Sequence, residues 1–283
     1  MKIEILGSGG ATTTPNPFCD CTTCGEARLK GPPFERTGPS VFFHDTSLLL
    51  DTPEEISHQL NRSNISQVEG CLYSHWHPDH TMGRRIWERK RNCFTFSCEK
   101  PTSVFIPEVA LEDFKHRLAL LDHLRYLESS GLIEISVVKD RQPFDFGGNT
   151  ITPVAMCEKG VSGFLVRDSR IDTLVIMDEH IGWVPDEACR GVDLAVLPMG
   201  LLFDDPWTGK RLVPAEHPNR GREASFLDTL ELIQVLKPKR AVLIHIEEPA
   251  RLVPQSAERL GRKITDDLGI QVEFSYDQMT IEL

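Results

Sequence analysis

The sequence lacks any apolar run close to the roughly 20 residues that a membrane-spanning helix needs. It is also short of positive charge: 31 lysines and arginines stand against 42 aspartates and glutamates, a net charge of −11 over 283 residues. So acidic a chain has no long-range attraction for nucleic acid or an anionic membrane. Its first residues, MKIEILGSGG, do not have the basic and then apolar order of a signal peptide. We therefore expect a cytoplasmic protein without membrane or nucleic-acid partners.

Neither disorder nor repetition is indicated by the composition. Apolar residues make up 40% and charged residues 26% of the chain, which is ordinary globular usage. With no internal repeat or linker, we predict one domain over residues 1–283. The only basic run is RRIWERKRN, from Arg84 to Asn92, and Trp87 is its only aromatic residue. This run favours a solvated helix face over a nucleic-acid-binding patch.

Cysteine is unevenly placed. Three of the eight cysteines lie together as Cys19, Cys21 and Cys24, and the others are scattered. Without a secretory signal, such a cluster indicates a metal site rather than a disulfide framework.

Short aliphatic and β-branched runs alternate with three stretches of helical periodicity. Strands in pairs with helices between them predict an α/β fold of two packed sheets covered by helices. FFHDTSLLL and FLVRDSRIDTLVIMD each place polar turn residues between two runs, which predicts antiparallel pairing. The expected strands are Lys2–Leu6, Ser40–Phe43, Ser47–Leu50, Gly70–Ser74, Ser103–Ile106, Ile133–Val138, Thr150–Met156, Gly163–Arg167, Thr173–Met177, Leu194–Leu197 and Ala241–Ile246, then a terminal hairpin over Gln271–Leu283. The expected helices are Leu111–Leu127, Ala224–Leu236 and Ser256–Leu268.

The strongest signal is the segment SHWHPDH, Ser74 to His80, directly after the apolar run CLY. Three histidines and one aspartate within six positions after a strand present imidazole and carboxylate ligands from a rigid support. Imidazole suits zinc and iron, and carboxylate favours harder ions. The segment therefore predicts a hydrolytic metal centre.

This HxHxDH segment resembles the signature of the metallo-β-lactamase superfamily. LGSGGA near the N-terminus and the cysteine cluster resemble the branch that contains the phosphoribosyl cyclic phosphodiesterase of the carbon–phosphorus lyase pathway and the B protein of pyrroloquinoline quinone biosynthesis. The similarity runs from the first strand to EFSYDQMTIEL. It implies an αββα sandwich of two mixed sheets, with a metal site at one edge.

The resemblance also implies a ligand set. His75 and His77 match the first metal site, Asp79 and His80 match the second, and Asp178, after TLVIM, matches the carboxylate that bridges the two ions. His245, in AVLIHIEE, matches the last histidine of the second site. The implied cofactors are two divalent ions, zinc or manganese with iron as a further option.

One family ligand is replaced. The third ligand of the first metal, a histidine in the family, corresponds to Cys157 in VAMCEKG, with Glu158 as the neighbouring candidate. Thiolate is a good zinc ligand at about 2.3 Å, so Cys157 would bias the site toward zinc or iron. Alternatively, Cys157 is a small buried residue and the first site is weakened or empty.

The cluster of Cys19, Cys21 and Cys24 supplies three thiolates, whereas a closed structural zinc site needs four ligands. In the phosphodiesterase branch a histidine supplies the fourth. Glu248 occupies that position here, so we predict a structural zinc with Glu248 as its fourth ligand.

A general acid is harder to place, because the family position falls on Ala224 or Phe226. His217 and His180 are the candidates, and each could also be an ordinary histidine. Arg220 and Arg222 could hold a phosphate through bidentate hydrogen bonds or could be solvated loop charges.

Together with these residues, the resemblance implies a phosphodiesterase acting on a small (cyclic) phosphodiester, with Asp79 orienting the water that attacks. The alternative is an oxidative or accessory enzyme of cofactor or natural-product biosynthesis with one redox-active iron, which Cys157 and the GRE element (221–223) favour. A non-enzymatic relic with an impaired first site is the third interpretation. A homodimer is left open.

Overall fold

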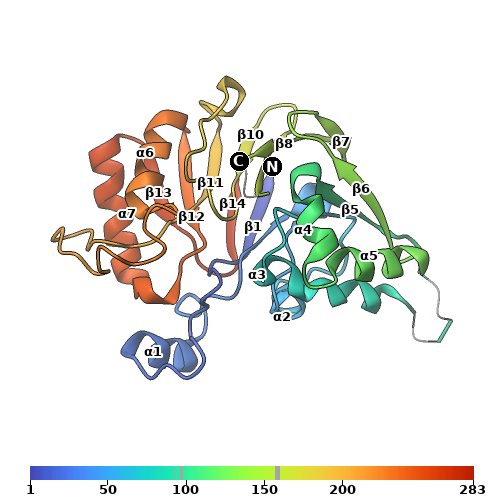
Figure 1. Ribbon diagram of the computed structural model, residues 1–283, viewed down its shortest axis with the longest axis horizontal. Helices are drawn as coiled ribbons and strands as arrows, with labels where there is room; N and C mark the ends of the chain where they lie inside the picture. Colours follow the sequence, from blue (N-terminus) through green and yellow to red (C-terminus); the bar gives the residue numbers. More distant parts are fainter. Residues whose placement is uncertain (93, 96–97, 157–159) are drawn as a thin grey trace.

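Two β-sheets pack face to face, and helices cover both outer faces (Figure 1). The computed structural model describes residues 1–92, 94–95, 98–156 and 160–283. Within these residues each sheet has seven strands. The arrangement confirms the predicted αββα sandwich.

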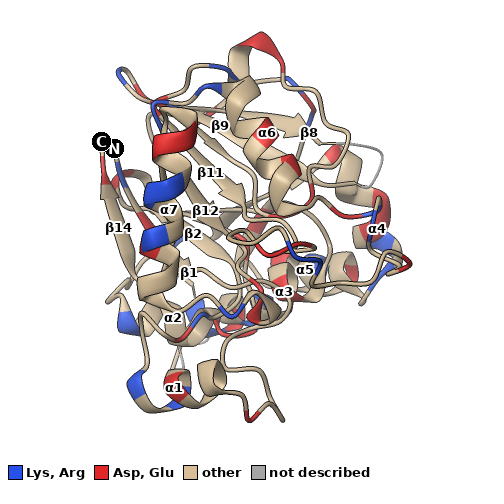
Figure 2. Cartoon of the chain, turned by 90° about the vertical axis from the view of Figure 1, so that its left-hand side faces the viewer, with Lys and Arg blue, Asp and Glu red and all other residues tan. Residues whose placement is uncertain are grey.

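The first sheet is built mostly from the N-terminal half of the chain, in the order β14-β1-β2-β3-β4-β5-β6. Its strands are β1 (Lys2–Gly7), β2 (Ser40–Phe43), β3 (Leu48–Leu50), β4 (Gly70–Leu72), β5 (Thr102–Pro107), β6 (Ile133–Val138) and β14 (Met279–Glu282). Because β14 runs antiparallel to β1, the two ends of the chain lie side by side (Figure 2).

The second sheet has the order β13-β12-β11-β10-β9-β8-β7. Its strands are β7 (Phe144–Phe146), β8 (Asn149–Ala155), β9 (Ser162–Arg167), β10 (Asp172–Val175), β11 (Leu194–Pro198), β12 (Arg240–Ile244) and β13 (Gln271–Phe274). The α-helices of the described chain are α1 (Thr22–Lys30), α2 (Ile56–Arg62), α3 (Pro78–Thr81), α4 (Leu111–His116), α5 (Leu120–Ser129), α6 (Phe226–Leu236) and α7 (Pro254–Leu268). Short 3₁₀ helices are η1 (His44–Thr46), η2 (Met82–Lys90), η3 (Glu108–Ala110), η4 (Glu187–Cys189) and η5 (Glu248–Ala250).

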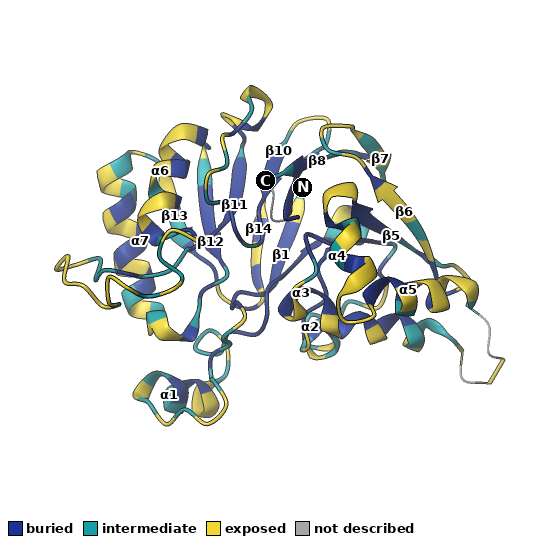
Figure 3. Ribbon diagram, viewed as in Figure 1, coloured by how far each residue is buried: buried dark blue, intermediate teal, exposed yellow. Residues whose placement is uncertain are grey.

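The strand sequences explain the layers, because successive side chains of a strand point to opposite faces. In β2, Val41 and Phe43 pack into the layer between the sheets, while Phe42 packs under the helices. The second sheet behaves alike: Val196 of β11 faces the other sheet, and Leu197 faces the α6 and α7 side. Both faces of these central strands are therefore buried, whereas the edge strands β6 and β7 and the outer faces of the helices are partly exposed (Figure 3).

The direction of the strands determines which loops lie at the same edge of each sheet. Strands β3, β4 and β5 are parallel, and so are β10, β11 and β12. The carboxyl ends of parallel strands meet at one edge of a sheet. The loops after β4, β10 and β12 are therefore available to build a common site.

Three expectations need correction. Gln271–Leu283 is not a hairpin, because β13 pairs with β12 and β14 pairs with β1, in different sheets. The expected helix Leu111–Leu127 is broken into α4 and α5, since Leu118 and Ala119 adopt positive φ values of 51° and 48°. The basic run is only partly solvated: Arg84 and Trp87 of η2 are buried. The antiparallel pairing of β2 with β3 and of β9 with β10 is confirmed.

Among the helices of the described residues, none combines the length and apolar character that crossing a bilayer requires.

Candidate metal centre

The loop after β4 carries the first half of the site. Ser74 is anchored on Asp51, which accepts hydrogen bonds from the Ser74 backbone N–H at 2.7 Å and its hydroxyl at 2.6 Å. Since that hydroxyl donates to Asp51, the 2.9 Å contact between Ser74 Oγ and His75 Nδ1 has the imidazole as donor. Pro78 then starts α3, which carries Asp79 and His80. His75, Asp79 and His80 are buried, whereas the side chain of His77 is 46% exposed.

The second sheet supplies the other half. Asp178 follows β10, and His245 directly follows β12 with a positive φ of 57° that turns the chain at the sheet edge. Asp178 Oδ2 lies 3.0 Å from His75 Nε2 and 3.5 Å from His77 Nδ1. Nε2 of His245 lies 3.4 Å from Asp79 Oδ2 and 3.7 Å from Asp178 Oδ1. All six residues expected from the two sheets therefore converge.

Two groups of ligand atoms can be recognised, each with all its atoms within 4.8 Å of one another. One group is His75, His80 and Asp178, and the other is Asp79, His80 and His245. His77 belongs to neither group and lies at their exposed side. His80 belongs to both groups, and Asp178 also approaches the second group, since its Oδ1 lies 3.7 Å from Nε2 of His245.

Three histidine ring nitrogens are available to bind a metal ion. Nε2 of His75, His80 and His245 is buried and has no hydrogen-bond partner among the residues that the structure describes. The opposite ring nitrogens are held: Nδ1 of His75 by Ser74, Nδ1 of His80 by Asp51 at 2.7 Å, and Nδ1 of His245 near Glu247 at 3.6 Å. Metal-binding histidines are held in this way, with one nitrogen on the ion and the other on a carboxylate, a hydroxyl or a backbone oxygen.

The charges of the site are strongly coupled. Burial opposes the charged form of His80, but Asp79 and Asp51 outweigh it and raise the pKa of His80 well above its usual range. Burial likewise opposes protonation of His245, yet Asp178 and Asp79 raise its pKa to about 9. Despite burial, His245 and His75 lower the pKa of Asp178 well below its usual value. The carboxylates are thus held ionised, as metal ligands must be.

Two predicted ligands fall outside this description. Cys157 and its neighbour Glu158 lie outside the described residues, so the third ligand of the first site stays a prediction.

The cysteine cluster forms a second candidate site, away from the histidines. Glu248 Oε1 lies 3.7 Å from Cys19 Sγ, 3.2 Å from Cys21 Sγ and 3.4 Å from Cys24 Sγ. All four ligand atoms lie within 4.8 Å of one another. Burial and the neighbouring thiols raise the pKa of Cys24 to about 12 in the metal-free protein, although an N–H from Asn16 opposes this. Three thiolates and a carboxylate are a closed donor set for zinc.

The predicted general acid His217 and Arg220, one of the two predicted phosphate-binding residues, have no hydrogen bond or ion pair with the metal-site histidines in the described chain. His217 is half-buried, and its Nδ1 accepts from the backbone N–H of Asn219 at 3.3 Å. Arg220 donates to the carbonyls of Pro214 at 3.0 Å and Val213 at 2.9 Å, and so holds its own loop. Arg222 is exposed. The structure therefore gives Arg220 a structural task.

His180, the other candidate acid, is buried with Nε2 2.9 Å from the Thr229 hydroxyl. Because that hydroxyl donates to Pro198 O, His180 must donate to it. Burial lowers the pKa of His180, so the ring is neutral at pH 7 and is held by α6.

The sequence interpretation missed Asp51 and Glu247, the carboxylates behind His80 and His245. Asp51 follows β3, LLL, and a carboxylate directly after a buried strand was the available signal. Glu247 accepts the backbone N–H of Ala11 at 3.1 Å and of Thr12 at 2.8 Å, which ties the LGSGGA loop to the site. That contact joins opposite ends of the chain, so no local pattern could reveal it.

Comparisons with known proteins agree with this geometry. Residues 45–246 match the sequence model of the beta-lactamase superfamily domain. The crystal structure of a diphosphatase of the PhnP family superposes with a TM-score of 0.70 at 21% identity, covering 100% of this chain and 97% of that one. The crystal structure of Zn²⁺-bound PqqB from Methylobacterium extorquens superposes with a TM-score of 0.72 at 15% identity, covering 100% of both chains. The crystal structure of human tRNase Z, short form, superposes with a TM-score of 0.64 at 17% identity, covering 100% of this chain and 99% of that one.

A curated relative is the octanoyltransferase of Porphyromonas gingivalis, 22% identical over 290 residues and 96% of this chain. The chain spans only 53% of the length of that protein.

Proposed function

The chain belongs to the β-lactamase superfamily, and from this premise we propose that it is a metal-dependent hydrolase that cleaves a small, cyclic or linear phosphodiester. The solved structures that share this fold include a diphosphatase and a tRNase Z, and both names denote hydrolases, which supports hydrolysis as the reaction. The phosphodiester substrate is our extension. The net charge of −11 does not attract an anionic substrate at long range, so binding would have to come from the metal ions and local arginines.

One observation carries the proposal. Three buried Nε2 atoms, of His75, His80 and His245, have no hydrogen-bond partner in the described chain and face carboxylate oxygens at 3.0, 3.2 and 3.4 Å. Histidine nitrogens and carboxylate oxygens brought this close together are the arrangement of a divalent metal site. Divalent ions bound by two carboxylates and three imidazoles satisfy all of them.

Each residue then has a defined task. His75 and His77 would hold one ion, with Cys157 completing the set. Asp79, His80 and His245 would hold the other, and Asp178 would bridge the two. Two bound ions supply Lewis acidity and lower the pKa of water toward neutrality. Asp79 and Asp178 orient the attacking water through their free lone pairs. His217 is the proposed proton donor to the leaving group, and Arg222 the proposed phosphate contact.

The cofactors follow from the donor types. Imidazole and carboxylate ligands suit zinc or manganese, and a thiolate from Cys157 would shift the preference toward zinc or iron. The cluster of Cys19, Cys21, Cys24 and Glu248 would bind a separate structural zinc. The oxidative alternative instead requires one redox-active iron at the histidine site.

The test uses the full chain loaded with zinc or with manganese. We expect two metals per chain beyond the structural zinc, and hydrolysis of bis(p-nitrophenyl) phosphate that His80→Ala reduces by at least about 100-fold. His116→Ala removes an exposed imidazole of α4 and should leave the rate unchanged. Full hydrolysis by His80→Ala, or no hydrolysis of phosphodiesters by fully loaded protein, would contradict the proposal. One iron per chain would favour the oxidative alternative.

A further inference from the structure

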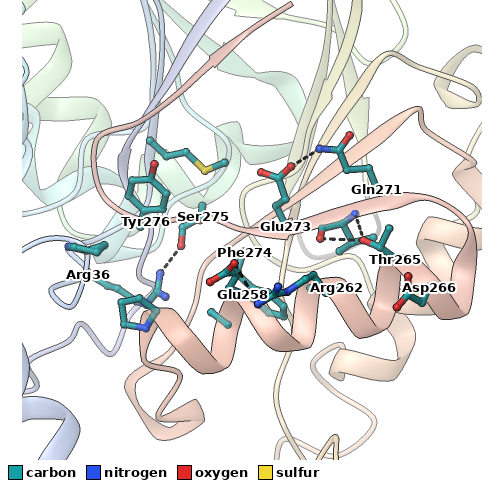
Figure 4. A pocket seen from close by; sticks show the side chains of 16 residues that line it. Arg36, Glu258, Arg262, Thr265, Asp266, Gln271, Glu273, Phe274, Ser275 and Tyr276 are labelled. Carbon is teal, nitrogen blue, oxygen red and sulfur yellow. Dashed lines mark hydrogen bonds and ion pairs between the residues drawn. The ribbon is translucent and has the colours of Figure 1, made fainter.

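A groove of about 740 Å³ lies on the outer side of the second sheet, between α7 and the edge strand β13 (Figure 4). None of the candidate metal ligands that the structure describes lines it. Ala257, Gly261 and Thr265 come from one face of α7, because they are spaced by four residues. Phe274, Met279 and Pro33 contribute apolar surface to its lining, and Arg36 lines it as well.

The inner end of the groove holds a buried arginine. Arg36 is 3% exposed, and its Nη1 donates to Ser8 Oγ at 3.1 Å and to Ser275 O at 2.5 Å. Its Nε and Nη2 donate to no group in the part of the chain that the structure describes. These two N–H groups form the side of a guanidinium that pairs with both oxygens of a carboxylate.

A second polar group is left over at the same place. Ser275 is 1% exposed, and its Oγ is buried without a hydrogen-bond partner among the described residues. Ser275 lines the groove beside Arg36, and its carbonyl accepts the Nη1 hydrogen bond (Figure 4). A buried hydroxyl without a partner costs free energy, so a ligand atom that accepts or donates there is stabilised.

The charge at the inner end is not balanced by Arg36's neighbours. Asp277 is the buried carboxylate nearby, and it already accepts from Ser8, from Thr37 and from Arg62. Two guanidinium groups thus share it, that of buried Arg36 and that of Arg62, whose side chain is 11% exposed. Burial lowers the pKa of Arg36 to about 10, against the effect of Asp277, so the group stays cationic at neutral pH.

The outer rim does not offer a competing cationic site. Arg262 pairs with Glu258 at 3.2 Å along α7, and Glu273 pairs with Arg240 at 2.8 Å. Along α7, basic residues in the middle of the helix lie between acidic residues toward its two ends (Figure 2). An anion is therefore best placed at Arg36 and Ser275, and not at the rim.

We propose that this groove binds a small carboxylic acid with an apolar body. The carboxylate would pair with Nε and Nη2 of Arg36 and accept from Ser275 Oγ. The hydrocarbon part would lie along Phe274, Met279 and Ala257. This site is separate from the metal centre and does not depend on the proposed phosphodiesterase activity.

The test is calorimetric titration of the full chain with 4-phenylbutyrate and with 4-phenylbutylamine, which differ only in the charged end. We expect saturable one-to-one binding of the acid and none of the amine. Ser275→Ala and Arg36→Gln should each weaken the binding at least about fivefold. Arg262→Gln, which removes the same charge from the rim, should change it less than twofold.

Because Arg36 is also structural, circular dichroism must show that Arg36→Gln is folded; if it is not, Ser275→Ala decides, since its hydroxyl has no partner to lose. Absence of saturable binding of the acid, equal binding of the amine, or undiminished binding by Ser275→Ala would each overturn the proposal.

Discussion

Nδ1 of His80 lies 2.7 Å from Oδ2 of Asp51, and both side chains are completely buried. Asp51 follows β3 and His80 lies on α3, so the contact joins two elements that are separate in sequence. The carboxylate fixes the ring so that Nδ1 carries the proton and Nε2 faces Asp79. This orientation is what a metal ligand needs.

We therefore predict that Asp51→Asn weakens metal binding at the His80 site by roughly 10–100-fold, the range found for such supporting residues. Asparagine has the same shape and tolerates the positive φ of 63° at this position, so the change removes charge without backbone strain. Competition with a chromogenic chelator measures the affinity. Asp122→Asn, an exposed position on α5, is the matched control. Equal affinity in both variants would show that Asp51 does not support the site.

Gly10 allows the N-terminal loop to approach His245. A Cβ at this residue would overlap Nδ1 of His245 and Oε1 of Glu247. Gly10→Ala should therefore displace the imidazole and remove most of the metal from that half of the site. Metal per chain is measured by mass spectrometry. Gly25→Ala, where a Cβ meets nothing within 4 Å inside α1, should keep the metal and slightly stabilise the helix. Full metal in Gly10→Ala would place His245 outside the ligand set.

The cysteine cluster should carry zinc that also stabilises the fold. Cys21→Ser should release one zinc per chain and lower the melting temperature by on the order of 10 °C, because metal binding energy is folding energy in a closed site. Cys98→Ser changes a cysteine outside the cluster and should alter neither quantity. Unchanged zinc in Cys21→Ser would refute the structural site.

Periodicity and strand-end polarity were enough to predict most of the layers. The paired runs before Asp51 and before Asp178 are local signals, and both became neighbouring strands of the predicted type. The prediction of a terminal hairpin was wrong because pairing between distant strands is not encoded locally. Strand β13 pairs with β12, while β14 pairs with β1 at the other end of the chain. The prediction of one continuous helix over Leu111–Leu127 was wrong for another reason. Leu118 and Ala119 hold left-handed conformations that their residue types do not announce.

In the candidate metal centre, too, some residues could be predicted from local sequence and others only from the tertiary structure. His75, Asp79 and His80 come from one short segment, and its composition alone indicated a metal centre. Asp178 and His245 required the family resemblance, since a single polar residue after a strand has many ordinary explanations. The supporting carboxylates of Asp51 and Glu247 act through tertiary contacts, and only the structure reveals them.

Arg220 is predicted to stabilise the loop of residues 201–225 rather than to bind phosphate directly. Its guanidinium lies 4.5 Å from the centre of the Phe203 ring and donates to three loop carbonyls, those of Phe203, Val213 and Pro214. Arg220→Gln should make thermolysin cleave this loop several-fold faster, while exposed Arg222→Gln should not. Equal cleavage of both variants would return Arg220 to the list of phosphate contacts.

The last prediction concerns Cys157, which replaces a family histidine and lies outside the described residues. If its sulfur binds the first metal, it must be thiolate, because thiolate rather than thiol coordinates ions. Cys157 should then resist alkylation in the metal-loaded protein and react after a chelator removes the metal. Cys157→His should keep both active-site ions, with a preference shifted toward manganese.

Cys157→Ala should lose the first ion and most of the hydrolysis, while the second ion is retained by Asp79, His80, Asp178 and His245. The three proteins are compared by metal per chain and by hydrolysis of bis(p-nitrophenyl) phosphate. A merely buried Cys157 predicts the opposite, an alanine variant with full metal and full rate. Because His75, His77 and Asp178 would then have to hold the first ion alone, that outcome would make the first site a three-ligand site open to solvent on the side of His77.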